Sequence, residues 1–166
     1  MKKMICLFLC LVSANVLAEE KMYKDWFVNT DRADYLYAIT LNNSGNIFGK
    51  YCYLDSGQCL YLTGIDTNCT TGNKYPVLVN ADSGAFNTFL HCGEKIGEQS
   101  VLVFDNFDVI ETAAKESKKI GIAVPMESGH FKVSRFSMSG SAYSINTLDK
   151  EAKKKVILSA PDSELL

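Results

Sequence analysis

The chain has 166 residues, with 17 basic and 19 acidic side chains that give a formal charge of −2. This length fits one domain and is sufficient to bury a hydrophobic core. There is no excess of basic residues to contact a phosphate backbone, so the composition argues against a nucleic-acid partner.

Residues 1–18 have the pattern of a secretory signal peptide. Lys2 and Lys3 precede an apolar run that ends in small residues, and we expect cleavage after Ala18. The run is too short to span a bilayer, which takes about 20 apolar residues, so we expect no transmembrane anchor. The sequence therefore predicts a periplasmic or secreted protein whose mature part has 148 residues, with 15 basic and 19 acidic side chains.

Four cysteines remain after this cleavage: Cys52, Cys59, Cys69 and Cys92. An even number in a secreted chain indicates two disulfides, and four cysteines allow three pairings. We favour Cys52–Cys59, because a turn-forming segment at 54–57 would place these residues opposite each other in a hairpin. Cys69–Cys92 would then close a second loop, worth about 3 kcal/mol in the chain-entropy model. A zinc site and a redox dithiol are the alternatives, although the sequence has no C-x-x-C motif.

Strand patterns dominate the mature chain. Apolar residues alternate with a second face over 35–41, and 47–54 with 58–63 predict a hairpin. The other predicted strands are 26–30, 75–80, 85–92, 100–104, 120–124, 131–138 and 142–148. Residues 19–24 are charged and predict a loose leader. The apolar parity switches within 131–138, which predicts a β-bulge near Ser134 and Arg135.

Helical signals are confined to two segments. A helix is predicted over 106–119, with Asp105 or Asn106 as its N-cap and lysines toward its C-terminal end. Residues 149–158 also have helical composition, either as a docked terminal helix or as a frayed end. About nine short strands separated by turns predict an all-β fold, a mainly antiparallel β-sandwich or β-barrel. We expect a single β-rich domain over 19–148, followed by a charged helix or tail over 149–166.

Catalytic and ligand-binding patterns are weak in this sequence. His91 is adjacent to Cys92, but neighbouring strand residues point to opposite faces, so the pair does not predict a joint site. His130 lies in a predicted turn without a placed partner. There is no Gly-x-Ser-x-Gly motif, and the run that contains Asp105 and Asp108 does not match an EF-hand loop. We therefore expect no cofactor, no metal site and no enzymatic activity.

A group of tyrosines gives the main functional hint: Tyr35, Tyr37, Tyr51, Tyr53 and Tyr61. All have odd numbers on neighbouring predicted strands, so we expect them on one face of a sheet. Tyrosine combines a large apolar body with a hydrogen-bonding tip and is enriched at protein interfaces. The five residues form a candidate partner-binding face, with ordinary cross-strand packing as the alternative interpretation.

Several features occur in a suggestive order: the signal peptide, an early Trp26, the paired cysteines, and FKVSRFSMSGSA at 131–142. Together they resemble the invasion-associated locus B family of small bacterial periplasmic proteins. The resemblance covers most of the mature chain, but Gly140 is followed by Ser141 where the family pattern leads us to expect Gly-Phe. It implies a β-rich, non-enzymatic envelope protein linked to host-cell association, and it implies no catalytic residue.

These observations lead to three hypotheses of function. The first is a secreted or periplasmic, disulfide-stabilised, non-enzymatic binding or envelope-accessory protein, with an unidentified protein partner in the envelope or in a host. The second is a periplasmic inhibitor of a host hydrolase such as lysozyme, because small β-barrel inhibitors share this size and compartment. The third is a small secreted hydrolase that uses His91 or His130 as a base.

Overall fold

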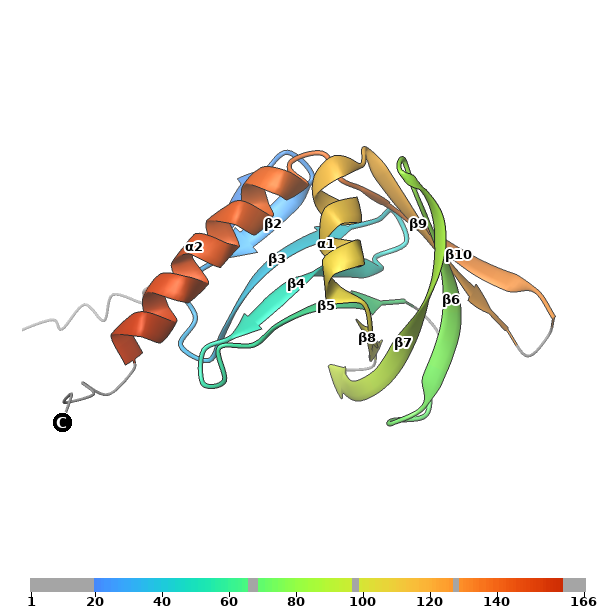
Figure 1. The fold of residues 1–166 in the computed structure, drawn as a ribbon, viewed down its shortest axis with the longest axis horizontal. Coiled ribbons are helices and arrows are strands. Elements are labelled where there is room, and N and C mark those ends of the chain that lie inside the picture. Colours follow the sequence, from blue (N-terminus) through green and yellow to red (C-terminus); the bar gives the residue numbers. More distant parts are fainter. Residues whose placement is uncertain (1–19, 66–68, 97–98, 127–128, 160–166) are drawn as a thin grey trace, which may run out of the picture.

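A computed structural model describes residues 20–65, 69–96, 99–126 and 129–159, and the predicted signal peptide lies outside them. Within these residues the strands form one antiparallel sheet in the order β1-β2-β3-β4-β5-β8-β7-β6-β9-β10 (Figure 1). The strands are β1 (Lys21–Tyr23), β2 (Trp26–Asn29), β3 (Tyr35–Leu41), β4 (Ile47–Tyr53), β5 (Cys59–Gly64), β6 (Lys74–Ala81), β7 (Gly84–Ile96), β8 (Gln99–Phe104), β9 (Lys119–Pro125) and β10 (Phe131–Ser137). The helices are α1 (Phe107–Glu116) and α2 (Ser141–Ser159). The prediction of a mainly antiparallel all-β fold with short helices is confirmed.

The sheet bends so that its two ends approach each other. The indole N–H of Trp26 in β2 donates to the carbonyl of Ser137 in β10 at 3.0 Å. The side-chain amide of Asn46, just before β4, donates to the hydroxyl of Ser134 in β10, also at 3.0 Å. Figure 1 shows β2–β5 and β6–β10 as the two arms of this bent sheet. We call the side that carries α1 and α2 the inner face, and the opposite side the outer face.

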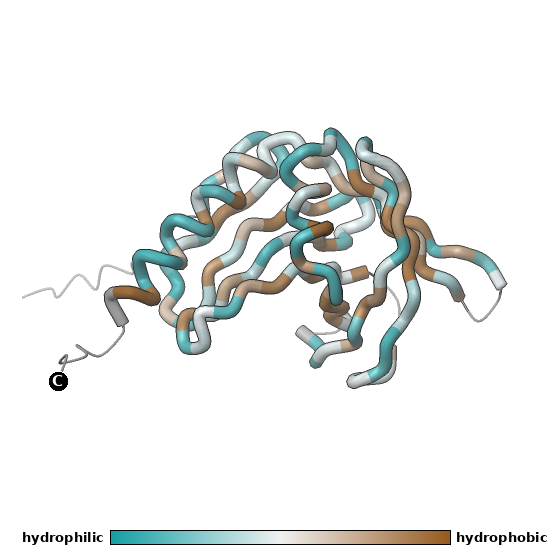
Figure 2. Tube along the Cα trace, viewed as in Figure 1, coloured by the Kyte–Doolittle hydropathy of each residue, from teal (hydrophilic) through white to brown (hydrophobic). Residues whose placement is uncertain are grey.

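The hydrophobic core fills the inner face. Alternate residues of the strands turn inward, which gives β3 and β6 a regular alternation of buried and more exposed positions. Figure 2 shows hydrophobic and hydrophilic residues interleaved along the strands. Ile110 and Ala114 of α1, together with Ile145 and Leu148 of α2, belong to the same buried cluster. Both helices therefore cover one continuous core.

The helix α1 begins and ends close to its predicted bounds. The side chain of Asn106 accepts a hydrogen bond from the backbone N–H of Val109 at 3.4 Å, which caps the first turn. Asp108 in the first turn and Lys115 in the last turn complement the helix dipole.

The strand predicted over 142–148 is wrong, because these residues form the first part of α2. Gly140 has a φ of +94°, and a Cβ atom there would lie 2.1 Å from the carbonyl oxygen of Tyr23. This glycine turn ends the extended chain and starts the helix. Ile145, Leu148 and Ala152 then recur at helical spacing and are buried.

Two further expectations are corrected by the sheet register. The predicted leader at 19–24 contains β1, whose residues pair with β2. The β-bulge predicted in β10 is absent, since every residue from Phe131 to Ser137 pairs in an unbroken register with β9. The apolar parity switches because Phe131 and Val133 lie exposed on the outer face, whereas Phe136 lies in the core.

Disulfides join Cys52 to Cys59 and Cys69 to Cys92, the pairing favoured from the sequence. The first connects directly opposed residues of the β4–β5 hairpin, and the second attaches the segment before β6 to β7. These bonds are compatible with an oxidising compartment such as the periplasm or the extracellular space. None of the helices in the described ranges is long and apolar enough to cross a membrane.

Candidate functional site

Four of the predicted tyrosines form a continuous group on the outer face. Tyr35 and Tyr37 of β3 lie directly opposite Tyr53 and Tyr51 of β4, respectively. The ring centroids of Tyr37 and Tyr51 are 5.5 Å apart, and Tyr35 lies 5.9–6.2 Å from the other three rings. We call these four residues the tyrosine ladder. Cross-strand pairing brings them together, because residues of equal parity meet in the β3–β4 register.

The fifth predicted member, Tyr61, lies on the opposite side of the sheet. It is 1% exposed and pairs with Lys50, whereas Tyr51 pairs with Leu60. The register of the β4–β5 hairpin places odd-numbered residues of β4 opposite even-numbered residues of β5. The shared odd numbering therefore does not continue into β5, and Tyr61 belongs to the core.

Two of the half-buried ladder tyrosines, Tyr37 and Tyr51, have raised pKa values. Burial, together with a 2.9 Å hydrogen bond to Glu20, raises the pKa of Tyr37 to about 12. Burial and the neighbouring tyrosines also raise the pKa of Tyr51. Each ladder hydroxyl of this kind can donate a hydrogen bond while its ring offers an apolar surface.

Replacing Glu20 with glutamine should lower the pKa of Tyr37 from its value of about 12. The neutral amide no longer disfavours the tyrosinate, while burial keeps the pKa above the ordinary value of 10.0. Titration of ¹³C-labelled tyrosine rings by NMR measures this change. Lys21→Gln is the matched control, and an unchanged Tyr37 titration in Glu20→Gln would contradict the role of the hydrogen bond.

A groove of about 790 Å³ lies at the end of the ladder. Its lining residues are Arg32, Ala33, Asp34, Tyr35, Tyr53, Leu54, Asp55 and Lys155. The guanidinium of Arg32 stacks 4.2 Å from the centre of the Tyr35 ring and pairs with Asp34 at 3.2 Å. The hydrogen bond from Arg32 holds the pKa of Asp34 below its usual range. The groove thus extends the aromatic surface with groups of both charges.

A second polar cluster, which the sequence did not indicate, lies on the inner face. Lys50 of β4 is 4% exposed and binds Glu111 of α1 at 2.8 Å and Asp149 of α2 at 2.5 Å. Lys115 contacts the same two carboxylates at 2.5 and 3.5 Å. Burial by itself would raise the pKa of Glu111, but hydrogen bonds from Lys115 and Lys50 hold it below its usual value. We call these four residues the inner ion cluster, which connects both helices to the sheet.

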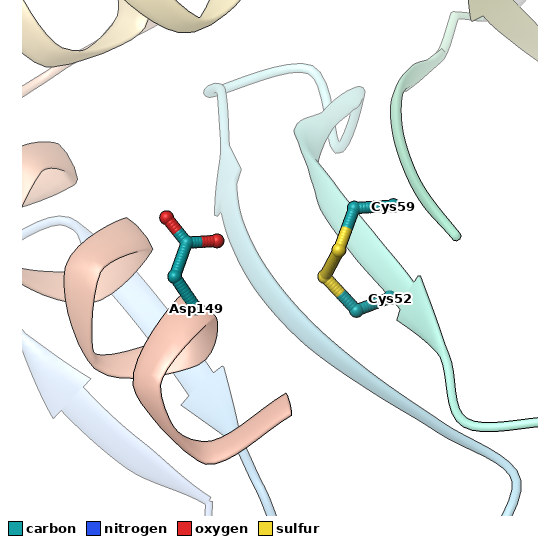
Figure 3. Close-up of side chains that lie close together, drawn as sticks. All are labelled: Cys52, Cys59 and Asp149. Atoms are coloured by element: carbon teal, nitrogen blue, oxygen red, sulfur yellow. A yellow bond between two sulfur atoms is a disulfide. The ribbon is translucent and has the colours of Figure 1, made fainter. Parts of the chain in front are cut away.

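One further group of ligand-type side chains contains Cys52, Cys59 and Asp149, whose ligand atoms lie within 4.8 Å of one another. Figure 3 shows the Asp149 carboxylate of α2 facing the disulfide between the two cysteines. Metal binding by cysteine requires the thiolate, which a disulfide does not provide. The grouping therefore reflects how α2 covers the disulfide.

The two histidines occupy separate places. The side chain of His91 contacts Asp105, which also pairs with Lys74 at 3.0 Å. His91 lies on the outer face, and Cys92 is buried on the inner one, as strand parity predicts. His130 accepts a hydrogen bond from Met126 through its backbone carbonyl. Among the described residues, neither imidazole is hydrogen-bonded to a serine hydroxyl.

No family model and no curated protein matches this chain. Among solved structures it is similar to the crystal structure of invasion associated protein B from Bartonella henselae, with 14% identity and a TM-score of 0.48. The alignment covers 81% of this chain and 99% of the other. This likeness agrees with the resemblance drawn from the sequence, and it concerns layout alone.

Proposed function

We propose that this chain is a non-enzymatic binding protein, periplasmic or secreted, that recognises a protein partner of the envelope or of a host through the tyrosine ladder. Cleavage after Ala18 would deliver the mature chain to a compartment in which its disulfides persist. The proposal covers the outer face of β3 and β4 together with the adjoining groove.

The observation that carries this proposal is the contact of all four ladder rings on the sheet face opposite both helices. Tyr53 is exposed, and the other three are half-buried. Such rings are held by their neighbours, so little side-chain entropy is lost when a partner covers them. Tyrosine and arginine are also the residue types that dominate binding energy at protein interfaces, and Arg32 lies directly on the ladder.

The groups near the ladder support binding in preference to catalysis. Arg32 is engaged by Asp34 and by the Tyr35 ring, and Lys155 donates to the carbonyl of Arg32 at 3.2 Å. These contacts fix the shape of the groove and offset its charges. A pairing of nucleophile and base would instead place an activated hydroxyl or thiol within reach of a proton acceptor.

The test is capture of a partner from envelope and host extracts on the immobilised mature protein, followed by measurement of its dissociation constant. Replacing Tyr51 and Tyr53 together with threonine, which keeps a good strand former, should weaken binding about 10- to 100-fold. Tyr143→Thr removes an exposed tyrosine of α2 and is the matched control, with affinity expected to stay within about twofold. Equal loss in the control and the ladder variant would contradict the proposal.

A further inference from the structure

The strand β10 forms one end of the sheet, and part of its backbone edge is open. β10 pairs with β9 alone. The N–H of Met138 donates toward β9, to the carbonyl of Lys118, whereas the carbonyl of Ser137 points the other way, to Trp26. Because these directions alternate along an antiparallel strand, the N–H and C=O groups of Val133 and Arg135 point away from β9. Within the part of the chain that the structure describes, those groups have no backbone partner.

A groove of about 740 Å³ runs beside this open edge. One wall is β10, and the other consists of β1, the beginning of β2 and the turn that follows β3. Met22, Leu41 and Val133 contribute exposed apolar side chains to the lining, with exposed fractions of 62%, 45% and 44%. Figure 1 shows the β9–β10 hairpin extending beyond the body of the sheet.

The groove is basic in a chain that is acidic overall. Lys24, Lys119 and Arg135 line it, and in the described ranges none of their side chains forms an ion pair or a hydrogen bond. Asp25 contributes a carboxylate to the lining of this groove. This carboxylate accepts a 2.6 Å hydrogen bond from the hydroxyl of Ser137. Three cations without a partner among the described residues therefore line an apolar channel next to the open part of the strand edge.

We propose that this groove binds an extended, acidic polypeptide segment that adds to the sheet as a strand beside β10. The backbone of such a segment would bond to the free edge at Val133 and Arg135, as in other complexes formed by strand addition. Its apolar side chains would contact Met22 and Leu41, and its carboxylates would pair with the three cations. At about 3.4 Å per residue, the length of β10 accommodates roughly six residues.

The charge of the groove favours this occupant over a second copy of the chain. A symmetric contact presents the same patch from both partners, so the cations of one copy would lie against the equally basic patch of the other. The other role for cations beside an open strand is to keep that edge from pairing at all. The two roles differ in whether an acidic peptide binds. The groove shares no residue with the tyrosine ladder, so the two proposals fail independently.

The probe is a fluorescein-labelled hexapeptide, Glu-Thr-Val-Thr-Glu-Thr with blocked ends, titrated against the full mature protein. Alternate residues of a strand share a face, so its glutamates and its valine can all face the outer side of the groove. We expect saturable binding that weakens with salt and that Arg135→Glu reduces at least about tenfold. Lys153→Glu, a charge reversal on α2, is the matched control and should leave the affinity unchanged. A peptide with lysine for glutamate, and one with N-methyl groups on alternate amides, should not bind.

Backbone NMR locates the peptide. The amide signals of Val133 and Arg135 should shift and exchange more slowly, while those of Tyr35 and Tyr53 stay in place. Val133→Pro removes one outward N–H and should abolish binding; if it does not fold, Arg135→Glu carries the test. The proposal is overturned by absence of saturation at millimolar peptide, by equal binding of the N-methylated peptide, or by sedimentation of the free protein as a dimer that Arg135→Glu dissociates.

Discussion

Replacing Phe48 with alanine should lower the free energy of unfolding by about 3–5 kcal/mol, as for other large core aromatics. Phe48 is fully buried where the two arms of the sheet meet. Its ring centroid lies 5.6–6.2 Å from four other aromatic rings: Trp26, Tyr61, Phe104 and Phe136. The substitution removes the ring that all four contact, so the cavity cannot close by the shift of one neighbour.

Equilibrium unfolding in urea measures this loss, with both disulfides intact. Phe131→Ala is the matched control, because Phe131 is 66% exposed on β10 and its loss should change stability by about 0.5 kcal/mol or less. If Phe48→Ala costs no more than Phe131→Ala, the aromatic cluster does not hold the two arms together. A change in the slope with urea would indicate loss of two-state unfolding instead.

Sequence periodicity predicted β3 and the hairpin that follows because one face of these strands is buried. Leu36, Ala38 and Thr40 are buried and alternate with outward-facing residues, of which Tyr35 and Tyr37 are the first two. This period-two signal fixes which side chains share a face within one strand. It does not fix how parity passes to the next strand, which depends on the hairpin register. For this reason four ladder tyrosines were predicted together correctly, and Tyr61 was assigned to the wrong face.

The remaining differences depend on contacts that are distant in sequence. The helix α2 was divided between a strand and a helical tail, because the burial of Ile145 and Leu148 against the sheet is a tertiary effect. The partners of Lys50 are 61 and 99 residues away, at Glu111 and Asp149. No local pattern relates such residues, and only the packing of α1 and α2 on the sheet brings them together.

The two faces of the sheet differ in which groups they leave accessible. The inner face holds the helices, the core and the ion cluster, whose members are satisfied by one another. The outer face and the β10 edge leave tyrosine rings, cations and backbone groups accessible to other molecules. A change on the inner face should therefore act on stability, and a change on the outer face should act on binding at nearly constant stability. The variants proposed for the ladder and the groove use this separation.

Replacing Lys50 with methionine should lower the free energy of unfolding at pH 7 by about 3 kcal/mol. Removing one partner of a buried ion pair leaves the other charges uncompensated, at a cost of about 3–5 kcal/mol. The lower end applies because Lys115 still contacts Glu111 and Asp149, whose side chains are 20% and 35% exposed. Methionine keeps the length of the stem over the Phe107 ring, so the loss reports mainly on charge.

The triple variant Lys50→Met, Glu111→Gln, Asp149→Asn separates charge from packing, because it also removes the negative charges of the two carboxylates that Lys50 binds. It should recover most of the stability lost in Lys50→Met.

The dependence of stability on acid pH gives a second test. The folded-state pKa of Glu111 is below its usual value of 4.5, so its contribution to wild-type stability is complete above that pH and is lost as the pH falls through the folded value. In Lys50→Met that contribution is smaller, because Lys115 alone still pairs with Glu111, so the stability difference from wild type should shrink between pH 7 and pH 3. A difference that is constant over this range, measured by urea unfolding at each pH, would show that the ion cluster does not stabilise the fold.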